Sequence, residues 1–229
     1  NIESEILRNN LNYTLFEWRK QSGYKPLNID KGEGVYLIDH QKNKILDFSS
    51  GLINVNIGHG DQRVTDAVVK QMQKVSYVNP STITKVRGEL GKKLSEICPG
   101  NLNKSFFTIC GATGIENAIK LARLYTGRHK ILTRYRSYHG STMGAMSAGG
   151  DPRKLKVDSQ MGTNFIHLEI PYKYRSSGHH WEQNCFDHLD RILSYEGPEN
   201  FAAIIMEGES GSSGCLKLPD GYFKKLRKV

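Results

Sequence analysis

The chain has 229 residues, of which 38% are hydrophobic and 24% are charged, and its formal net charge is +9. This composition is typical of a folded globular protein, and the apolar runs fall far short of the roughly 20 residues that cross a bilayer. Because the basic residues are spread thinly and are not interleaved with aromatic residues, the positive charge does not predict nucleic-acid binding.

The spacing of apolar residues predicts an N-terminal segment followed by a longer region of alternating strands and helices. The predicted elements, in chain order, are a helix over 5–19, a hairpin of strands 34–39 and 44–48, helices over 61–75 and 86–97, a strand at 104–108, a helix over 112–125, strands at 129–133, 164–168 and 201–206, and helices over 181–195 and 219–229. Such alternation predicts βαβ units and a mostly parallel sheet that is covered on both faces.

The turn between the strand at 104–108 and the helix over 112–125 is the first candidate for chemistry. The strand is followed by the small residues Cys110-Gly111-Ala112, and the helix begins at about Thr113. Free N–H groups and the dipole of a first helical turn favour a phosphate, and small residues let a ligand approach the backbone. The same residues are also explained, without any ligand, by a tight turn between strand and helix that requires glycine.

Two further candidates follow strands of the predicted sheet. Tyr138 and His139 come after the strand at 129–133, and Glu207 comes directly after the strand at 201–206. Because ligands gather at the carboxyl ends of parallel strands, an aromatic ring there can stack on a planar cofactor. Glu207 is expected to be a buried or half-buried carboxylate. Each candidate by itself also has an explanation without a ligand. Tyr138 and His139 could simply pack in their loop, and Glu207 could stabilise a turn.

Taken together and in this order, these pieces resemble the class III aminotransferases, fold type I enzymes that use pyridoxal 5′-phosphate (PLP). Further matching segments are Gly34–Asp39, Leu46–Gly51, Asn56–Gly60, Ala122–Arg128 and Pro219–Tyr222. The resemblance covers almost the whole chain. It implies an α/β fold: a truncated three-layer α/β/α large domain with a mostly parallel sheet over residues 50–229, preceded over residues 1–49 by an N-terminal helix and β-hairpin segment of the small domain.

The resemblance also implies the residues of a site. The implied cofactor-binding residues are Cys110, Gly111, Ala112, Thr113, Tyr138, His139 and Glu207, and the implied substrate-pocket residues are Ser50, Gly51, Leu52, Ile53 and Ser212. Gly111 and Ala112 match the pair whose backbone N–H groups hold the phosphate, and Tyr138 matches the aromatic residue that stacks on the pyridine ring. Glu207 matches the carboxylate beneath the cofactor. Thr113 departs from the family, which usually has an acid at this position.

No catalytic residue is implied within this chain. In the family, the Lys that forms the Schiff base and the Asp that pairs with the pyridine nitrogen lie further along than Val229. The chain lacks an initiator Met and breaks off inside a predicted helix. We therefore expect a fragment of a longer protein, inactive by itself.

The activity that the resemblance implies for the full-length protein is amino transfer from an ω-amine or ω-amino acid to a keto acid such as pyruvate, by a homodimer. Ser212 stands where some enzymes for ornithine-like substrates carry a gating Glu, which favours a taurine- or β-alanine-like donor. Two alternatives remain: aminomutase or decarboxylase chemistry on the same scaffold, and a non-catalytic ligand-binding or interaction protein if the chain ends at Val229.

The other polar residues do not predict chemistry. In the group His179, His180, Cys185 and His188 only some spacings suit a metal site, and the sequence offers no second Cys pair, so no metal is expected. The four cysteines form no CxxC pair, which predicts reduced thiols and a cytoplasmic location, with organelle targeting left open. No membrane partner is expected. Glu116 and Lys120 are predicted to be a solvated pair on the outer face of their helix.

Overall fold

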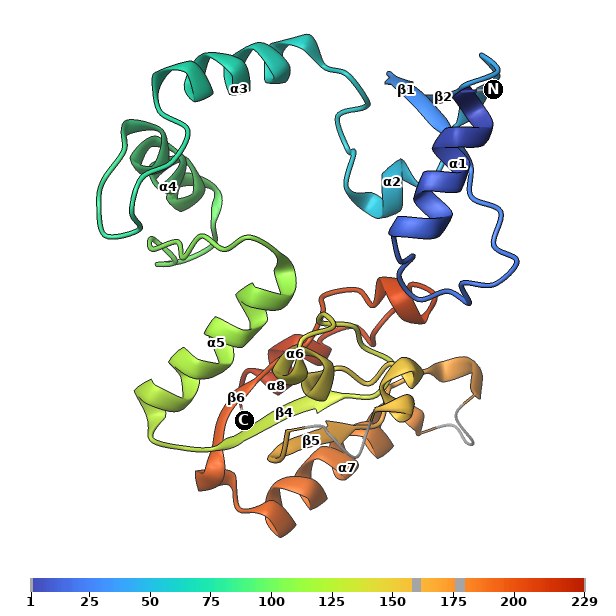
Figure 1. Cartoon of the computed structure of the whole chain (residues 1–229). Coiled ribbons are helices and arrows are strands. Elements are labelled where there is room, and N and C mark those ends of the chain that lie inside the picture. Colours follow the sequence, from blue (N-terminus) through green and yellow to red (C-terminus); the bar gives the residue numbers. More distant parts are fainter. Residues whose placement is uncertain (1, 158–161, 176–179, 229) are drawn as a thin grey trace. The chain divides into compact units, whose positions relative to one another are not determined.

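The computed structural model describes residues 2–157, 162–175 and 180–228 (Figure 1). The chain divides into two compact units, Asn1–Gly88 and Glu89–Val229. The division falls within helix α4 (Lys85–Ile97). The domain boundary predicted after residue 49 stays a prediction. Among the described residues, no helix is long and apolar enough to cross a membrane.

The N-terminal unit contains a three-stranded antiparallel sheet of order β1-β2-β3. Its elements are α1 (Ile2–Tyr13), β1 (Ile29–Glu33), β2 (Tyr36–Asp39), β3 (Lys44–Leu46), α2 (Ser50–Ile53) and α3 (Gln62–Lys74). The predicted first helix ends early, at Tyr13, where the Thr14 hydroxyl instead donates to the Asn10 carbonyl at 2.6 Å. Strand β1 was not predicted, because its residues do not alternate between apolar and polar.

The predicted hairpin is confirmed as β2 and β3. Tyr36 pairs with Leu46, and Ile38 pairs with Lys44. The turn between the strands is closed by the Asp39 carboxylate, which accepts the backbone N–H of Asn43 at 2.8 Å. This is the local hydrogen bonding that makes Asp and Asn common in turns.

Helix α2 is a left-handed turn. The φ angles of Ser50, Gly51, Leu52 and Ile53 are 49°, 57°, 62° and 67°. The left-handed conformation costs a residue with a side chain roughly 1–2 kcal/mol, and for a β-branched residue such as Ile53 it is an outlier. The turn therefore persists only because its surroundings hold it.

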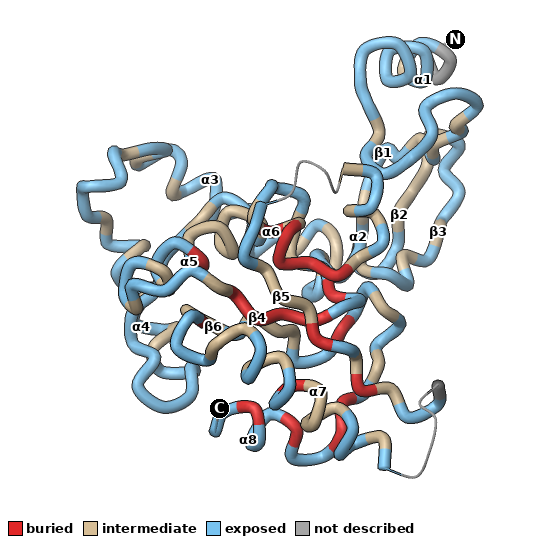
Figure 2. The backbone as a smooth tube through the Cα atoms, turned by 90° about the horizontal axis from the view of Figure 1, so that it is seen from below, coloured by how far each residue is buried: buried red, intermediate tan, exposed pale blue. Residues whose placement is uncertain are grey.

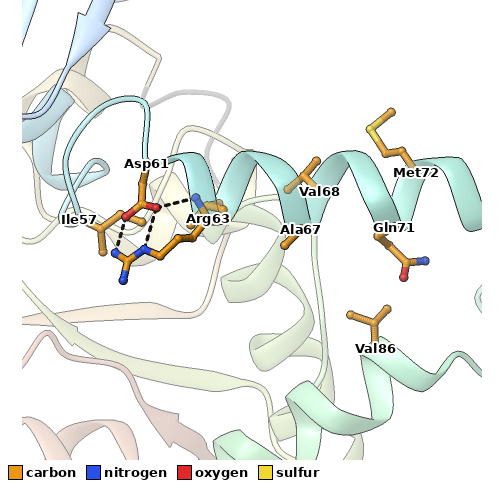
Figure 3. A pocket seen from close by; sticks show the side chains of 9 residues that line it. Ile57, Asp61, Arg63, Ala67, Val68, Gln71, Met72 and Val86 are labelled. Atoms are coloured by element: carbon orange, nitrogen blue, oxygen red, sulfur yellow. Dashed lines mark hydrogen bonds and ion pairs between the residues drawn. The ribbon is translucent and has the colours of Figure 1, made fainter.

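Helices α3 and α4 border an apolar pocket of about 580 Å³ within the N-terminal unit (Figure 3). The side chains of Val68, Met72 and Val86 line it. Asp61 caps α3, accepting the backbone N–H of Arg63 at 2.9 Å and forming an ion pair with the Arg63 guanidinium. The pocket is lined almost entirely by carbon, so it offers little for acid–base chemistry.

The second unit is built on a parallel sheet of order β5-β4-β6. Its elements are β4 (Lys130–Arg134), β5 (Phe165–Leu168), β6 (Phe201–Ile204), α5 (Gly111–Thr126), α6 (Met143–Ala148), α7 (Trp181–Glu196) and α8 (Tyr222–Leu226), with single 3-10 turns at Pro152–Lys156, Lys173–Arg175, Pro198–Asn200 and Gly211–Ser213. Figure 2 shows buried residues along β4 and α6. These strands and helices confirm the α/β prediction.

The two faces of β4 are covered by different helices. Ile131 packs with Ile119 of α5 and with Ala148, which ends α6. Leu132 points to the opposite face and packs in the cluster that contains Leu189 of α7 and Tyr222 of α8. Successive strand residues face opposite sides of a sheet, so the sheet lies between two helical layers. The predicted three-layer arrangement is confirmed.

The strand predicted at 104–108 is wrong. No strand is assigned to this segment, and none of the described strands pairs with it. Its apolar residues remain at the surface, where Phe106 is 68% and Phe107 is 42% exposed. An apolar run becomes a strand only where a neighbour supplies the hydrogen bonds of a ladder.

Candidate functional site

Residues from three of the predicted segments lie together at the carboxyl edge of the parallel sheet. The backbone N–H of Tyr138 donates to Oε1 of Glu207 at 3.3 Å, which joins the loop after β4 to the loop after β6. Gly140 packs on the start of α5, since a Cβ placed on it would lie 2.5 Å from the Cβ of Ala112. The phosphate-turn, stacking and carboxylate candidates are therefore neighbours.

The start of α5 is open. Cys110 is the N-cap and has extended backbone, and a Cβ placed on Gly111 would meet no atom of the described residues within 4 Å. The Cys110 thiol lies 3.2 Å from the Thr113 hydroxyl. This hydrogen bond, with weaker ones from the backbone N–H groups of Thr113 and Ala112, lowers the pKa of Cys110. The same groups that favour a thiolate here are donors that an anion at the helix N-terminus uses.

The loop after β4 presents an aromatic face and a buried imidazole. The Tyr138 ring is partly exposed, and the Arg153 guanidinium lies 4.5 Å from its centroid. His139 follows it, and Nε2 of its ring is buried with no hydrogen-bond partner among the described residues. Burial lowers the pKa of His139, the Glu207 carboxylate opposes this change, and Arg134 adds to it. His139 is accordingly a neutral imidazole near pH 7.

Glu207 is paired with a buried cation that sequence analysis did not single out. Nη2 of Arg134 lies 3.4 Å from Oε2 of Glu207, and the Arg134 side chain is fully buried at the end of β4. Its Nε and Nη1 atoms have no hydrogen-bond partner among the described residues. A buried guanidinium needs a nearby anion. The feature of the sequence that could have identified Arg134 is its position as a charged residue at the end of an apolar strand.

Glu116 is not the solvated residue that helical spacing predicted. Its Oε1 atom accepts hydrogen bonds from the Thr142 hydroxyl at 2.6 Å and from the backbone N–H groups of Gly144 at 2.8 Å and Ala145 at 3.2 Å. It therefore caps α6 from within α5. Burial raises the pKa of Glu116, but the three hydrogen bonds and the charge of Lys120 outweigh it and lower the pKa overall.

The predicted substrate-pocket residues lie in two places. Ser212 is exposed on the 3-10 turn Gly211–Ser213, and the preceding Ser210 anchors that turn by donating to the Arg136 carbonyl at 2.8 Å. This places Ser212 on a segment tied to the loop that carries Tyr138. Ser50, Gly51, Leu52 and Ile53 form α2 in the N-terminal unit. Their membership of one site with Tyr138 stays a prediction.

Among the described residues, no group of three His, Cys, Asp or Glu side chains could hold a metal ion. His179 of the group considered in the sequence lies outside those residues. Cys185 is half-buried on α7, and burial, followed by the charges of Glu169 and Glu182, raises the pKa of its thiol.

The family model of the class-III aminotransferases matches residues 19–229. The solved structure of taurine:2-oxoglutarate aminotransferase from Bifidobacterium kashiwanohense, in complex with PLP and glutamate, is similar with a TM-score of 0.93 and 34% identity, covering 99% of this chain and 52% of that chain.

Two curated relatives carry different activities in their names. The putrescine–pyruvate aminotransferase of Pseudomonas aeruginosa is 30% identical over 228 residues, which is 90% of this chain and 49% of that protein. The isoleucine 2-epimerase of Lentilactobacillus buchneri is 31% identical over 215 residues, covering 90% of this chain and 47% of that protein. The chain therefore spans about half the length of the curated relatives it matches.

Proposed function

The chain belongs to the class-III aminotransferases, and from this premise we propose that it forms the first half of a PLP-dependent transaminase. The full-length protein moves an amino group from an ω-amine or ω-amino acid to a keto acid. The observation that carries this proposal is the meeting of an open helix N-terminus, a partly exposed aromatic ring and a half-buried carboxylate at one sheet edge.

The residues present fit a planar cofactor that carries a phosphate. At Gly111 the backbone is open, so the first N–H groups of α5 are accessible to phosphate oxygens, and Thr113 adds a hydroxyl. Thr113 is neutral, so it adds no negative charge beside the phosphate. Tyr138 supplies the stacking surface, and Glu207 supplies an acceptor for the polar groups of the ring.

Three residues keep this site in order. Arg134 holds the Glu207 carboxylate from the buried side, and Glu207 in turn holds the loop at the backbone N–H of Tyr138. Glu116 ties α5 to the far end of that loop. When bound, PLP withdraws electrons from the carbon that carries the amino group, and the chain's own residues bind and orient the cofactor for this chemistry.

The substrate class is proposed on two grounds. Ser212 is small, neutral and exposed, so it places no carboxylate on its turn. Relatives named for taurine and for putrescine share 34% and 30% of their aligned residues with this chain. We therefore infer a donor whose reacting amine is distant from its acid group, or which has no carboxyl group, with pyruvate or 2-oxoglutarate as acceptor. A homodimer is the proposed assembly.

A second reaction on the same site is favoured by one relative, the isoleucine 2-epimerase. In an epimerase the amino group stays on its carbon and the configuration changes.

The test uses the full-length protein, obtained by reading the coding region onward from Val229. Purified protein is incubated with PLP, pyruvate or 2-oxoglutarate, and taurine, β-alanine or putrescine in turn. Formation of alanine or glutamate supports the proposal. Loss of stereochemical purity in an amino acid substrate without amino transfer supports the epimerase instead. A stop codon directly after Val229, or no product with any donor, contradicts the transaminase.

A further inference from the structure

Arg153 lies on the ring of Tyr138, the residue expected to stack on the cofactor, and sequence analysis did not assign it. Both residues belong to the second unit. The central carbon of the guanidinium, Cζ, is 4.5 Å from the centroid of the ring, and Tyr138 is still 37% exposed with this cation in place. A guanidinium is attracted to the negative face of an aromatic ring, so the contact holds the ring as well as the cation.

The Asp151 carboxylate fixes the guanidinium in this position. Nε of Arg153 donates to Oδ1 of Asp151 at 2.7 Å and Nη2 donates to Oδ2 at 2.8 Å, which is the two-bond geometry that orients a guanidinium best. Asp151, whose side chain is 17% exposed, also accepts the backbone N–H of Arg153 at 2.8 Å and so caps the 3-10 turn Pro152–Lys156. The hydrogen bond from the Arg153 side chain lowers the pKa of Asp151, although burial opposes it, so the pair is charged near pH 7.

The segment that carries Arg153 is paired with the loop that carries Tyr138. The backbone N–H of Gly150 donates to the Ser137 carbonyl at 2.9 Å, and the Gly150 carbonyl accepts the N–H of Arg136 at 2.9 Å. A Cβ on Gly150 would lie 2.6 Å from the backbone nitrogen of Arg136, so the two segments approach as closely as glycine allows. The position of Arg153 on Tyr138 therefore follows from backbone pairing as well as from the contact of the two side chains.

We propose that Arg153 is a positioning residue for the cofactor: it covers one face of the Tyr138 ring and so holds the opposite face toward the pyridine ring of PLP. This rests on the proposed function, in which Tyr138 is the stacking residue. A side chain that is fixed before binding does not have to be ordered when its ligand arrives, which lowers the free-energy cost of binding. Arg153 thus supports the cofactor through Tyr138.

The test compares three variants of the full-length protein. Arg153→Met removes the charge and keeps an unbranched side chain, Arg153→Lys keeps the charge and loses the planar fork, and Asp151→Asn removes the charged anchor of Arg153. The matched control is Lys225→Met on α8, which removes a cation 4.0 Å from the ring centroid of Phe186 in the same unit. The dissociation constant of PLP is measured by absorbance titration of the apoprotein, and the induced circular dichroism of bound PLP reports how its ring is held.

Arg153→Met is expected to raise the dissociation constant of PLP about two- to tenfold, because the Tyr138 ring must then be ordered on binding. The induced circular dichroism per bound cofactor is expected to fall, since a loosely held ring gives PLP a less defined asymmetric environment. Arg153→Lys recovers part of both effects. Asp151→Asn gives a smaller increase in the dissociation constant, which keeps the test valid if Arg153→Met does not fold. Lys225→Met leaves both quantities unchanged.

A second measurement follows Tyr138 in the apoprotein, without PLP. Hydroxyl radicals oxidise aromatic rings faster where the rings are more exposed, and tandem mass spectrometry gives the oxidation rate of Tyr138 itself. Arg153→Met is expected to raise this rate, because the covered face of the ring becomes accessible, and Lys225→Met is expected to leave it unchanged.

Three results overturn the proposal. The first is an unchanged dissociation constant in both Arg153→Met and Asp151→Asn, and the second is an equal increase in Lys225→Met. The third is tighter binding of PLP by Arg153→Met, which would place the guanidinium on the face that the cofactor needs. If the unmodified protein binds no PLP, the proposed function fails. The oxidation rates then still decide whether Arg153 covers the Tyr138 ring, and an unchanged rate in Arg153→Met rejects that contact.

Discussion

Replacing Glu116 tests whether a side chain on α5 fixes the loop that carries Tyr138. Glu116→Ala removes three hydrogen bonds and leaves the N–H groups of Gly144 and Ala145 without their acceptor. Loss of a helix cap costs about 0.5–2 kcal/mol, and a bond to a charged group is worth about 1.5–3 kcal/mol. Because Glu116 is only half-buried and water replaces part of what is lost, we expect the free energy of unfolding to fall by about 2–3 kcal/mol.

The assay is urea unfolding of the full-length protein at pH 7, followed by far-ultraviolet circular dichroism. Glu116→Gln keeps one acceptor oxygen and should lose only about 1 kcal/mol. The control is Glu96→Ala on α4, where the carboxylate forms an exposed ion pair at 3.6 Å with Lys93. Such pairs are worth about 0–1 kcal/mol. Equal losses in Glu116→Ala and Glu96→Ala would refute the capping role.

The lowered pKa of Glu116 fixes the sign of a pH dependence. A carboxyl whose pKa is lower in the folded than in the unfolded protein stabilises the fold above its unfolded pKa, and this stabilisation is lost as the pH falls through the folded value. The stability difference between the unmodified protein and Glu116→Gln should therefore be constant from pH 7 to about 5.5 and shrink below the ordinary glutamate pKa of about 4.3. A difference that grows on acidification would contradict this.

Two further predictions concern the start of α5. Cys110, whose pKa is lowered, should react with iodoacetamide at pH 7.5 faster than Cys185, whose pKa is raised, and added PLP should slow the reaction of Cys110 alone. Both rates are measured by mass spectrometry. Equal rates for the two thiols would contradict the difference in reactivity, and an unchanged Cys110 rate with PLP would contradict binding at the start of α5. Gly140→Ala should weaken PLP binding in an absorbance titration, because its Cβ would collide with Ala112. Gly208→Ala should bind PLP normally, because a Cβ there meets none of the described residues within 4 Å.

Part of this architecture could be predicted from the sequence because it is locally encoded. The apolar runs of β4 and β6 and the helical spacing of α5 are each explained by what the residues bury. The candidate positions 138 and 207 could be placed at one sheet edge because parallel strands bring their carboxyl ends together. Positions 110–113 reach this edge through the close approach of Ala112 to Gly140, and not through a strand that precedes them.

The rest depends on partners that spacing does not reveal. The apolar residues of 104–108 predict a strand, but a strand needs a neighbouring strand to supply its hydrogen bonds. No strand among the described residues pairs with this segment. Glu116 was predicted to be solvated because helical spacing shows which face of the helix a residue lies on, but not which loop packs against that face. The left-handed angles of Leu52 and Ile53 run against their intrinsic preference. The hydrogen bonds that hold this turn come from its surroundings, such as the bond from Nδ2 of Asn54 to the Gly51 carbonyl, and apolar spacing does not reveal them.

The pairing of Arg134 with Glu207 has a consequence for the order of events during synthesis. The two residues are 73 positions apart, and Arg134 sits fully buried in the central strand. A guanidinium cannot leave water at low cost before its carboxylate arrives. The ribosome must therefore release the chain through Glu207 before β4 can settle into its final place. Until then, the centre of the sheet stays hydrated and exposed to chaperones.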